Sequence, residues 1–293
     1  RLNTWLGSRR RLAIAGFSAR FARRSRLLPL FRAVAPAKFR RLTDAIPAHP
    51  KAFRVRPGSR FEAKGEVRGS VSLHLGCVDP QMFGEVLQHS IEVLQQEGFH
   101  VEVPTQPSCC GALEAHAGAG DIGRHRGNAT LRALRGHQAI LVPASGCASF
   151  LHELDPKLPV MDPMAFLHQV GLRSECKAIA ARIAYDPPCH QNNVLKSTDA
   201  TCALLAGIPK LDLVEAEDAE LCCGAGGMAF LREPELSLEV GGFKAQALIQ
   251  TGATEIVSGN SGCRLQLESS LRAAGGSIPV AHPISLLHRA LLG

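Results

Sequence analysis

The sequence predicts an α/β protein made of two pseudo-repeated units with parallel sheets, preceded by a basic helical arm. Three observations support this fold class. The 293-residue chain matches itself from residue 70 onward, each half alternates short apolar segments with amphipathic ones, and basic residues are concentrated near the amino terminus. We therefore expect an arm over residues 1–68, a first cysteine-rich unit over 69–176 and a second over 177–293.

The arm over 1–68 differs in charge from the rest of the chain. It contains 18 Lys and Arg against 3 Asp and Glu, whereas the remainder contains 15 against 23. Basic residues alternate with Leu, Phe and Ile over residues 1–50, which predicts one or two amphipathic helices interrupted near Pro29 and Pro36. Such an arm suits a linker packed on its own protein, or a docking surface for an acidic partner or anionic lipid. Nucleic acid is not expected as a partner, because no reading motif accompanies the charge.

The chain has no run of about 18 uncharged apolar residues, so no transmembrane helix is expected. The segment that follows Arg9, Arg10 and Arg11 is too short and too mixed for a secretory signal. We therefore expect a cytoplasmic protein, with peripheral contact at the inner face of the cell membrane as the alternative. Because the first residue is Arg1 rather than Met, we also expect that upstream sequence precedes it.

The internal repeat is the most informative feature of the sequence. Its matched segments are VSLHLGC ending at Cys77 with RIAYDPPC ending at Cys189, SCCGA at 108–112 with LCCGA at 221–225, ILVPASGC ending at Cys147 with EIVSGNSGC ending at Cys263, and LPVMDPMAFLH at 158–168 with IPVAHPISLLH at 278–288. The spacings agree as well. Cys77 and Cys109 are 32 residues apart, and Cys189 and Cys222 are 33 apart. Duplication of a single unit explains both halves.

Each half reads as short apolar strands that alternate with amphipathic helices. In the first half we expect strands near 71–76, 100–104 and 139–144, and helices near 82–97, 120–135 and 147–154. The helix that begins around Gln81 places an apolar stripe on one face and ends near Gly98, a usual stop residue. The stripe consists of Phe83, Val86, Leu87, Ile91 and Leu94. This alternation implies a Rossmann-like arrangement with a parallel sheet and right-handed crossovers.

The repeated cysteines follow the expected strands, where open parallel sheets bind ligands. Ten cysteines in a chain with its own core indicate a metal role in a reducing compartment rather than a disulfide framework. Cys147 and Cys263 open expected helices, whose dipoles favour thiolates. Four thiolates per half suit zinc or an iron-sulfur cluster, and the absence of short Cys-x-x-Cys knuckles favours the cluster. The candidate ligands are Cys77, Cys109, Cys110, Cys147, Cys189, Cys222, Cys223 and Cys263.

Other chemically interesting residues are expected to be structural. Cys176 and Cys202 lack partners in the other half and suit packing. His190, next to Cys189, suits a supporting hydrogen-bond donor, and the repeated His168 and His288 suit caps of a packed helix face. GAGG at 224–227 lacks the spacing of a dinucleotide fingerprint and suits the backbone of a cluster-binding loop.

The doubled pattern Cys, CCG, Cys resembles the cysteine-rich CCG domain. This domain occurs in glycolate oxidase iron-sulfur subunits, in lactate-utilisation proteins, and in subunits of anaerobic glycerol-3-phosphate dehydrogenase and of heterodisulfide reductase. The motifs GCVDP, SCCGA, PASGCASF, ELCCGAGG and NSGCRLQL are most similar to those of the glycolate oxidase subunit, over about residues 70–292. The resemblance implies an iron-sulfur electron-transfer subunit of a glycolate-type 2-hydroxy-acid dehydrogenase, an oxidoreductase component that does not itself bind the acid.

The same resemblance implies cofactors and partners. It implies 4Fe-4S clusters, up to one per repeat, on the eight cysteines, and further clusters in an amino-terminal ferredoxin-like domain upstream of this chain. An FAD-containing dehydrogenase subunit would supply electrons, which pass toward quinone. The basic arm would be the linker after the ferredoxin domain and the part that contacts a membrane surface or quinone.

One departure from the family pattern limits the chemistry. The full pattern ends Cys-x-x-Cys, but Phe150 and Gln266 occupy the position of the fifth cysteine in each half. Four ligands per half suffice for one cluster, whereas disulfide cleavage at a five-cysteine cluster is not expected. The alternatives are a lactate-utilisation type iron-sulfur protein, a zinc-stabilised scaffold without redox activity, and thiol-disulfide chemistry at the adjacent cysteines.

Overall fold

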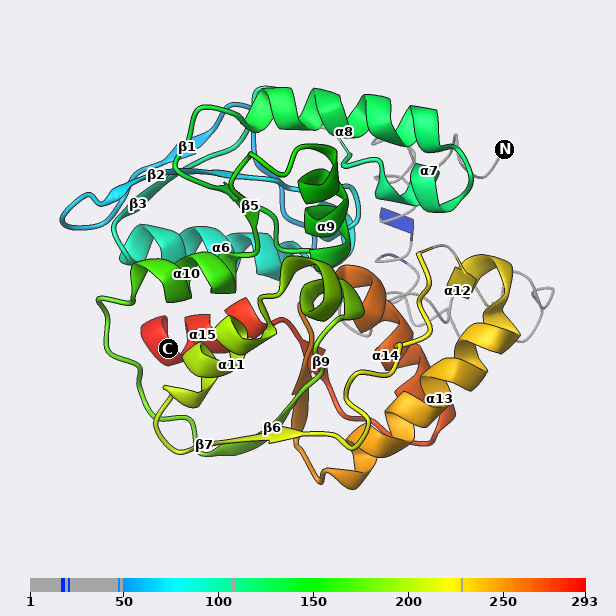
Figure 1. The fold of residues 1–293 in the computed structure, drawn as a ribbon. Helices are drawn as coiled ribbons and strands as arrows, with labels where there is room; N and C mark the ends of the chain where they lie inside the picture. Colours follow the sequence, from blue (N-terminus) through cyan, green and yellow to red (C-terminus); the bar gives the residue numbers. More distant parts are fainter. Residues whose placement is uncertain (1–16, 19–20, 22–46, 48–49, 107–108, 228) are drawn as a thin grey trace.

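The computed structural model describes residues 17–18, 21, 47, 50–106, 109–227 and 229–293, which form two α/β units (Figure 1). The amphipathic helices expected over residues 1–50, with their interruptions near Pro29 and Pro36, lie almost entirely outside these described residues. No helix in the described ranges has the length and apolar character needed to cross a membrane.

The first unit contains a five-stranded sheet in the order β1-β3-β2-β4-β5. Its strands are β1 (Arg60–Phe61), β2 (Gly69–Leu73), β3 (Phe99–Glu102), β4 (Ile140–Leu141) and β5 (Val160–Met161). Among these described strands, only β1 is antiparallel to its neighbour. The helices are α5 (Asp79–Met82), α6 (Gly84–Gln96), α7 (Ala112–His116), α8 (Gly120–Leu134), α9 (Ser145–Leu154) and α10 (Pro163–Val170).

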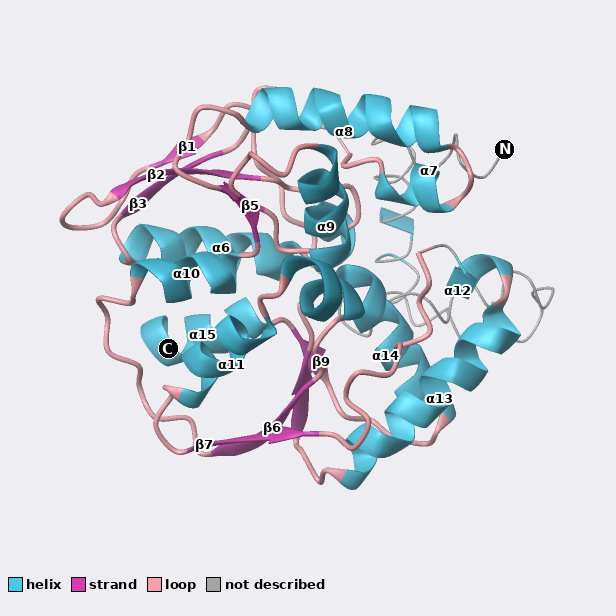
Figure 2. Ribbon diagram, in the orientation of Figure 1, coloured by secondary structure: helices cyan, strands magenta, loops and turns pink. Residues whose placement is uncertain are grey.

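The second unit contains a parallel four-stranded sheet in the order β7-β6-β8-β9 (Figure 2). Its strands are β6 (Ala181–Tyr185), β7 (Leu211–Glu215), β8 (Glu255–Val257) and β9 (Val280–Ala281). A π-helical turn, η1 (Gln191–Leu195), follows β6. The α-helices are α11 (Thr198–Ala206), α12 (Ala229–Arg232), α13 (Pro234–Gln250), α14 (Ser261–Ala273) and α15 (Pro283–Leu292).

The two sheets have the same topology, because β7-β6-β8-β9 repeats the order β3-β2-β4-β5. This confirms the predicted fold class of two Rossmann-like units with parallel sheets. The expected strands and helices of the first half correspond to β2, β3, β4, α6, α8 and α9, with bounds that differ by a few residues. Strand β1 was not expected from the sequence. It adds residues of the predicted arm to the edge of the first sheet.

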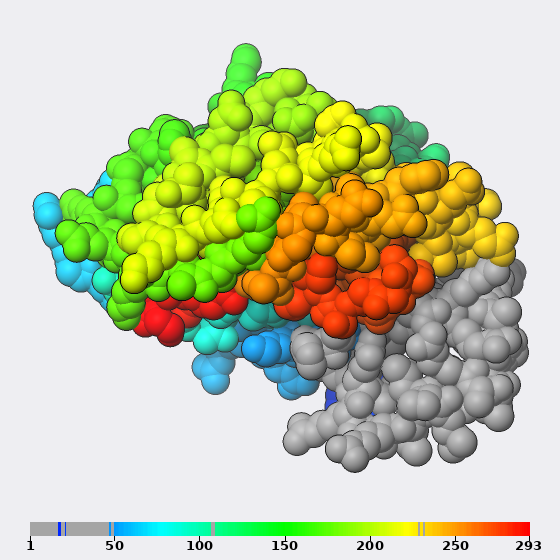
Figure 3. Space-filling view, turned by 90° about the horizontal axis from the view of Figure 1, so that it is seen from below, coloured from blue at the N-terminus to red at the C-terminus, as the bar shows by residue number. Residues whose placement is uncertain are grey.

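The units pack against each other through helices that lie between the two sheets (Figure 1). Helix α6 contacts α15, and α10 contacts α11. These contacts are equivalent under the repeat, since α11 corresponds to α6 and α15 to α10. One apolar core crosses the boundary, joining Leu87 and Phe166 of the first unit to Leu205 and Leu287 of the second. Seen from below, yellow and orange segments of the second unit cover much of the described surface (Figure 3).

The helix expected from Gln81 is divided at Phe83 into α5 and α6. Phe83 forms a β-bridge with Lys51, and Gly84 lies so close to the Ala52–Phe53 backbone that a Cβ would come within 2.4 Å of the Phe53 nitrogen. A tertiary contact therefore breaks the helix that the local pattern predicts. The apolar stripe of this helix is buried, as predicted, and Gly98 follows it with φ of 87°.

Candidate metal centres

The eight repeated cysteines lie at the carboxyl edges of the two sheets. Cys77 follows β2 and Cys189 follows β6, while Cys147 and Cys263 lie in the first turns of α9 and α14. Backbone N–H groups at the start of these helices have no partner within the helix, so the dipole favours thiolates there. All ten cysteines of the chain are free thiols.

Site 1, defined by Cys77, Cys109, Cys110 and Cys147, brings together the four repeated cysteines of the first unit. The Sγ atoms of Cys109 and Cys77 are 3.6 Å apart, and those of Cys110 and Cys147 are 3.0 Å apart. The Gly111 N–H donates to Cys109 Sγ at 3.5 Å. Cys109 and Cys110 are buried, with 6% and 2% of their surface exposed.

Site 2, defined by Cys189, Cys222, Cys223 and Cys263, repeats this arrangement in the second unit. The Sγ atoms of Cys223 and Cys263 are 3.0 Å apart, and Cys189 interacts with Cys222. The Gly224 N–H donates to Cys222 Sγ at 3.4 Å, the same contact that Gly111 makes in site 1. Cys222 is exposed, whereas Cys223 and Cys263 are buried.

The glycine of each CCG sequence is required by the turn that presents the cysteine pair. Gly111 and Gly224 have φ of 88° and 85°, in the left-handed region that disfavours residues with a Cβ. A Cβ on Gly111 would lie 2.2 Å from the Gly123 carbonyl oxygen, and one on Gly224 would lie 2.4 Å from that of Ser237. The helices α8 and α13 therefore pack directly against the two cysteine loops.

The acid-base properties of the thiols follow from their mutual contacts. Hydrogen bonds from Cys110, then Cys77 and the Gly111 N–H, lower the pKa of Cys109 far below its usual value. Hydrogen bonding to Cys109 raises the pKa of Cys77 and of Cys110. A hydrogen bond with Cys110, followed by the nearness of His74, lowers the pKa of Cys147 to about 7. Neighbouring thiols thus share protons, which a bound metal would displace.

Site 2 has the same pattern of ionisation. Hydrogen bonds with Cys189 and then Cys223 lower the pKa of Cys222 strongly, and the Gly224 N–H adds to this effect. The pKa of Cys189 and that of Cys223 are raised, chiefly by hydrogen bonding to Cys222. In both units the first cysteine of the CCG sequence is therefore the thiol most readily ionised.

A cavity of about 160 Å³ lies between the two units, beside site 1. Its walls include Cys77, Cys110 and Cys147 from the first unit and Phe230, Asn260 and Gly262 from the second. Backbone contacts hold the units together here, since the Ser145 N–H donates to the Gly259 carbonyl oxygen at 3.1 Å. Site 1 thus faces a space that both units enclose.

The donor set fits an iron-sulfur cluster in each unit. In each unit, four sulfur donors lie together at the carboxyl edge of the sheet. One backbone N–H group in each site, from Gly111 or Gly224, donates to a cysteine sulfur. Thiolates suit iron-sulfur clusters and zinc, and hydrogen bonds to sulfur are among the protein features that adjust a cluster. At the level of donor chemistry, the residues therefore fit either group.

The positions of the missing fifth cysteines are occupied by packing residues. Phe150 lies in the apolar cluster around site 1, close to Gly127. Gln266 donates from Nε2 to the Ser237 carbonyl oxygen at 2.8 Å and so joins α14 to α13. Cys176 and Cys202 contact the core away from both sites, and burial raises the pKa of each.

The histidines singled out from the sequence differ in their surroundings. His190 Nδ1 lies 3.6 Å from Cys189 Sγ, as suits a supporting donor. His288 stacks on His89 and lies 2.6 Å from a Glu92 oxygen, so it contacts a packed face as predicted. His168 is exposed on α10, and the expectation that it caps a packed face was wrong because its side chain turns to solvent.

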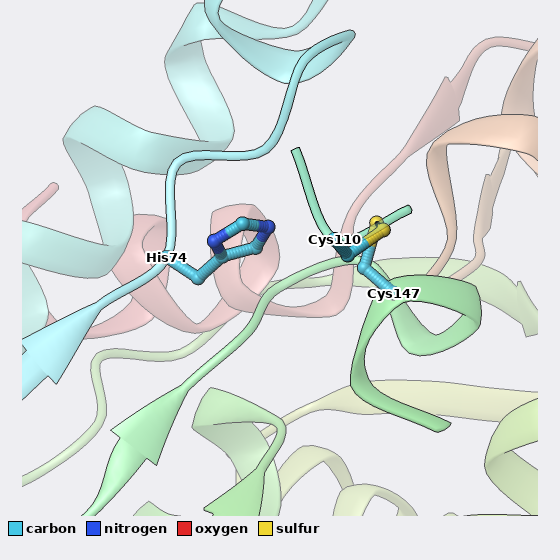
Figure 4. A group of neighbouring side chains, drawn as sticks. All are labelled: His74, Cys110 and Cys147. Carbon is cyan, nitrogen blue, oxygen red and sulfur yellow. Dashed lines mark hydrogen bonds between the residues drawn. The ribbon is translucent and has the colours of Figure 1, made fainter. Parts of the chain in front are cut away.

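Sequence reasoning missed three buried residues behind the sites. His74 follows β2 directly, and its ring lies beside Cys110 and Cys147 (Figure 4). Asp186, at the same place in the second unit, pairs with Lys244, whose Nζ lies 2.8 Å from Asp186 Oδ1. The available signal was a polar residue three positions before the first cysteine of each half. Lys244 carried no signal, because it reaches this place only through the packing of α13.

Comparison with known proteins identifies a repeated domain in this chain. The sequence profile of the cysteine-rich domain (CCG) matches twice, over residues 71–152 and 183–268. Lactate utilization protein A of Oceanobacillus iheyensis is 27% identical over 74% of this chain and 96% of its own length. A probable glycolate oxidase iron-sulfur subunit of Bacillus subtilis is 28% identical over 87% of this chain and 62% of its own.

A third relative aligns with this chain over a smaller share of its own length. A fumarate reductase (CoM/CoB) subunit of Methanothermobacter marburgensis is 28% identical over 78% of this chain and 48% of its own length. The chain thus spans nearly all of the lactate utilization protein but only about half to two thirds of the other two relatives. The two profile matches together cover more than half of the sequence, and the chain belongs to the cysteine-rich CCG domain family of iron-sulfur proteins.

Proposed function

We propose that this protein is the iron-sulfur electron-transfer subunit of a glycolate-type 2-hydroxy-acid dehydrogenase. The observation that carries the proposal is the gathering of four thiols at the same sheet edge in both units. One cluster of the 4Fe-4S type would be held by Cys77, Cys109, Cys110 and Cys147. A second would be held by Cys189, Cys222, Cys223 and Cys263. Such clusters take up and release single electrons, while the chain supplies the ligands and a protected environment.

The comparisons support an oxidoreductase subunit, since relatives that carry the domain are named as subunits of an oxidase and a reductase. The extent of the alignment favours the glycolate type. The match with the glycolate oxidase subunit covers 87% of this chain, a larger share than the two units at 69–293 make up. It therefore includes part of the basic arm as well as both units.

The proposed partner is an FAD-containing dehydrogenase subunit that oxidises the acid and passes its electrons to this chain. Electrons would leave toward quinone, with the arm over 1–68 contacting the membrane surface. The division into units at 69–176 and 177–293 is part of the same proposal, as are further clusters in a ferredoxin-like segment upstream. Burial of Cys109, Cys110, Cys223 and Cys263 would keep water from half of the sulfur ligands.

A lactate-utilisation role is the second candidate, and one observation favours it. The relative of that name aligns over 96% of its own length and 74% of this chain, a share that the two units alone accommodate. A protein of that extent corresponds to the two units without the arm. The native upstream sequence separates the two candidates, because only the glycolate type is expected to carry an attached ferredoxin-like segment.

Anaerobic purification followed by iron and sulfide analysis and EPR spectroscopy tests the proposed function. We expect brown protein with iron and acid-labile sulfide in equal amounts, visible absorbance that bleaches on reduction, and an EPR signal from the reduced protein. Addition of the partner flavoprotein and glycolate should bleach the same absorbance. Colourless protein that contains zinc and no iron would overturn the proposal in favour of a structural scaffold.

A further inference from the structure

His74 is the buried side chain beside site 1 that the eight-cysteine assignment leaves unused. The residue is 3% exposed, and its Nε2 atom has no hydrogen-bond partner among the described residues. A buried polar atom without a partner costs free energy, so such atoms in native structures usually have a ligand or water. The ring needs a partner in the functional protein.

Two thiols are in place to share that partner with His74. A ring nitrogen of His74 and the Sγ atoms of Cys110 and Cys147 all lie within 4.8 Å of one another. Figure 4 shows the ring after β2 facing the two sulfur atoms, which come from the cysteine loop and from α9. Metal bonds of about 2.1 Å to nitrogen and 2.3 Å to sulfur place these two donors about 3.6 Å apart at a tetrahedral metal. A side-chain shift of about 1 Å therefore suffices for shared coordination.

Comparison with the second unit shows that the fold does not require a histidine at the position of His74. His74 and Asp186 occupy equivalent places, since each lies three residues before the first cysteine and donates its backbone N–H to the neighbouring strand, His74 to Leu141 and Asp186 to Val257. Asp186 is engaged through both carboxylate oxygens, accepting from Ser258 Oγ at 2.8 Å and pairing with Lys244 at 2.8 Å. Of the two residues, the histidine is the one whose ring faces the thiols of its site, with Cys110 and Cys147 as its neighbours.

We propose that His74 is a fifth donor of site 1 and binds the metal centre there through Nε2, beside the thiolates of Cys110 and Cys147. Imidazole suits iron, and histidine replaces cysteine on one iron of certain two-iron clusters. The donor fills the chemical place left by the missing fifth cysteine at Phe150. Site 1 then has five donors and site 2 has four, so the two centres of a duplicated fold are chemically distinct.

This inference rests on the proposed function, and its test separates the two. The full chain is produced with ¹⁵N-labelled histidine, purified anaerobically and reduced, and its nitrogen couplings are measured by pulsed EPR. We expect a strong histidine coupling of the size that a direct iron-nitrogen bond gives. The variant H74Q should lose this coupling and release iron to a chelator about tenfold faster, the lower range for loss of a supporting residue.

Two further variants make the outcome specific. His190→Gln is the matched control, because His190 lies beside a cysteine of site 2, and it should keep the coupling. His74→Cys places a sulfur donor at the same position and should retain iron, lose the coupling and lower the reduction potential of site 1, since histidine ligation raises the potential relative to thiolate. If H74Q does not fold, this cysteine variant decides.

The results that overturn the inference are distinct from those that overturn the proposed function. Iron-bearing protein in which the histidine coupling is weak or absent, or persists in H74Q and in His74→Cys, removes His74 from the ligand set and leaves the electron-transfer proposal standing. Protein without iron and sulfide overturns both. A coupling lost only in His190→Gln assigns the nitrogen to site 2 and also overturns the role of His74.

Discussion

Site 1 and site 2 share a backbone arrangement but differ in what lies behind and in front of their thiols. Site 1 is backed by His74, whose Nε2 atom has no hydrogen-bond partner among the described residues. Site 2 is backed by the buried ion pair between Asp186 and Lys244. In front, Cys109 is 6% exposed while its counterpart Cys222 is exposed. The two units therefore share the positions of their sulfur atoms but differ in the charge and the access of solvent around them.

Replacement of a cysteine ligand tests whether the two sites are separate centres and has the largest expected effect. Cys110→Ser should remove the centre of site 1 and Cys223→Ser that of site 2. Each variant should lower iron and sulfide to about half, because each site would hold one of two clusters. Iron and sulfide analysis of anaerobically purified protein measures this. Cys202→Ser, at a cysteine packed away from both sites, should keep the full content. Loss of all iron from either single variant would show that the sites are not independent.

Breaking the ion pair behind site 2 should affect stability next most. Lys244 and Asp186 are only 1% and 2% exposed, and removal of one partner from such a pair typically costs about 3–5 kcal/mol. Lys244→Met should therefore lower the free energy of unfolding by about that amount in urea titration. Arg182→Met removes one partner of the exposed pair with Asp212 and should cost less than about 1 kcal/mol. Equal effects of the two variants would contradict a special role for the buried pair.

Two adjacent glycines of α13 test how tightly the helix packs on the cysteine loop. A Cβ on Gly241 would lie 2.3 Å from Ser270 Oγ and 2.9 Å from the Cys223 carbonyl oxygen, so Gly241→Ala should destabilise by about 1–3 kcal/mol. Gly242 has no atom within 4 Å of such a Cβ, and Gly242→Ala should stabilise by about 0.5–1 kcal/mol. Thermal unfolding of both variants measures the difference. An unchanged melting temperature of Gly241→Ala would show that the loop containing Cys223 can move to accommodate the added methyl group.

Gly127 makes the equivalent approach in the first unit, where its Cβ would lie 2.9 Å from the Cys110 carbonyl oxygen. Gly127→Ala should therefore destabilise to a similar extent as Gly241→Ala and lower iron retention at site 1 rather than site 2. Spectra of the two variants would show which signal belongs to which unit. An equal loss of both signals from either variant would count against separate environments.

Thiol reactivity should distinguish the sites with the smallest change to the protein. In metal-free, reduced protein the pKa of Cys222 is far below its usual value through hydrogen bonds with Cys189 and Cys223, and the side chain is exposed. Its alkylation by iodoacetamide should change little between pH 6 and 8, whereas an ordinary thiol reacts about tenfold faster per pH unit below its pKa. The pKa of Cys109 is also lowered, but this side chain is buried, so its alkylation should be slow.

Peptide mass spectrometry of protein alkylated for short times gives these rates residue by residue. A steep rise in Cys222 labelling with pH would show that its proton is not shared with the neighbouring thiols. Faster labelling of Cys109 than of Cys222 would contradict the difference in burial between the sites.

Much of the fold could be predicted because it rests on local patterns present twice. The apolar stripe from Phe83 to Leu94 is buried, and glycines follow both cysteine pairs for a conformational reason that holds in any context. The break in that helix could not be predicted, because it comes from the approach of Lys51 and Phe53, distant in sequence, to Phe83 and Gly84.

The candidate sites were predictable to a different degree. Equal spacing of cysteines in two halves was enough to expect two groups of four thiols, since residues after neighbouring parallel strands meet at one sheet edge. It was not enough to expect His74 beside them. From the sequence, a histidine after an apolar strand could not be distinguished from an ordinary half-buried residue. Its position beside the thiols depends on the cysteine loop and α9, which come from distant parts of the chain.

By itself, the sequence determined the duplication, the alternation of an α/β unit and the set of eight thiols, because these follow from periodicity and from the conformational preferences of single residues. Tertiary structure decided which groups stand behind those thiols and how far water reaches them. Lys244 is distant from Asp186 along the chain, and only the packing of α13 beside β6 brings the two charges to 2.8 Å. Contacts between distant segments depend on the whole fold, and no local pattern encodes them.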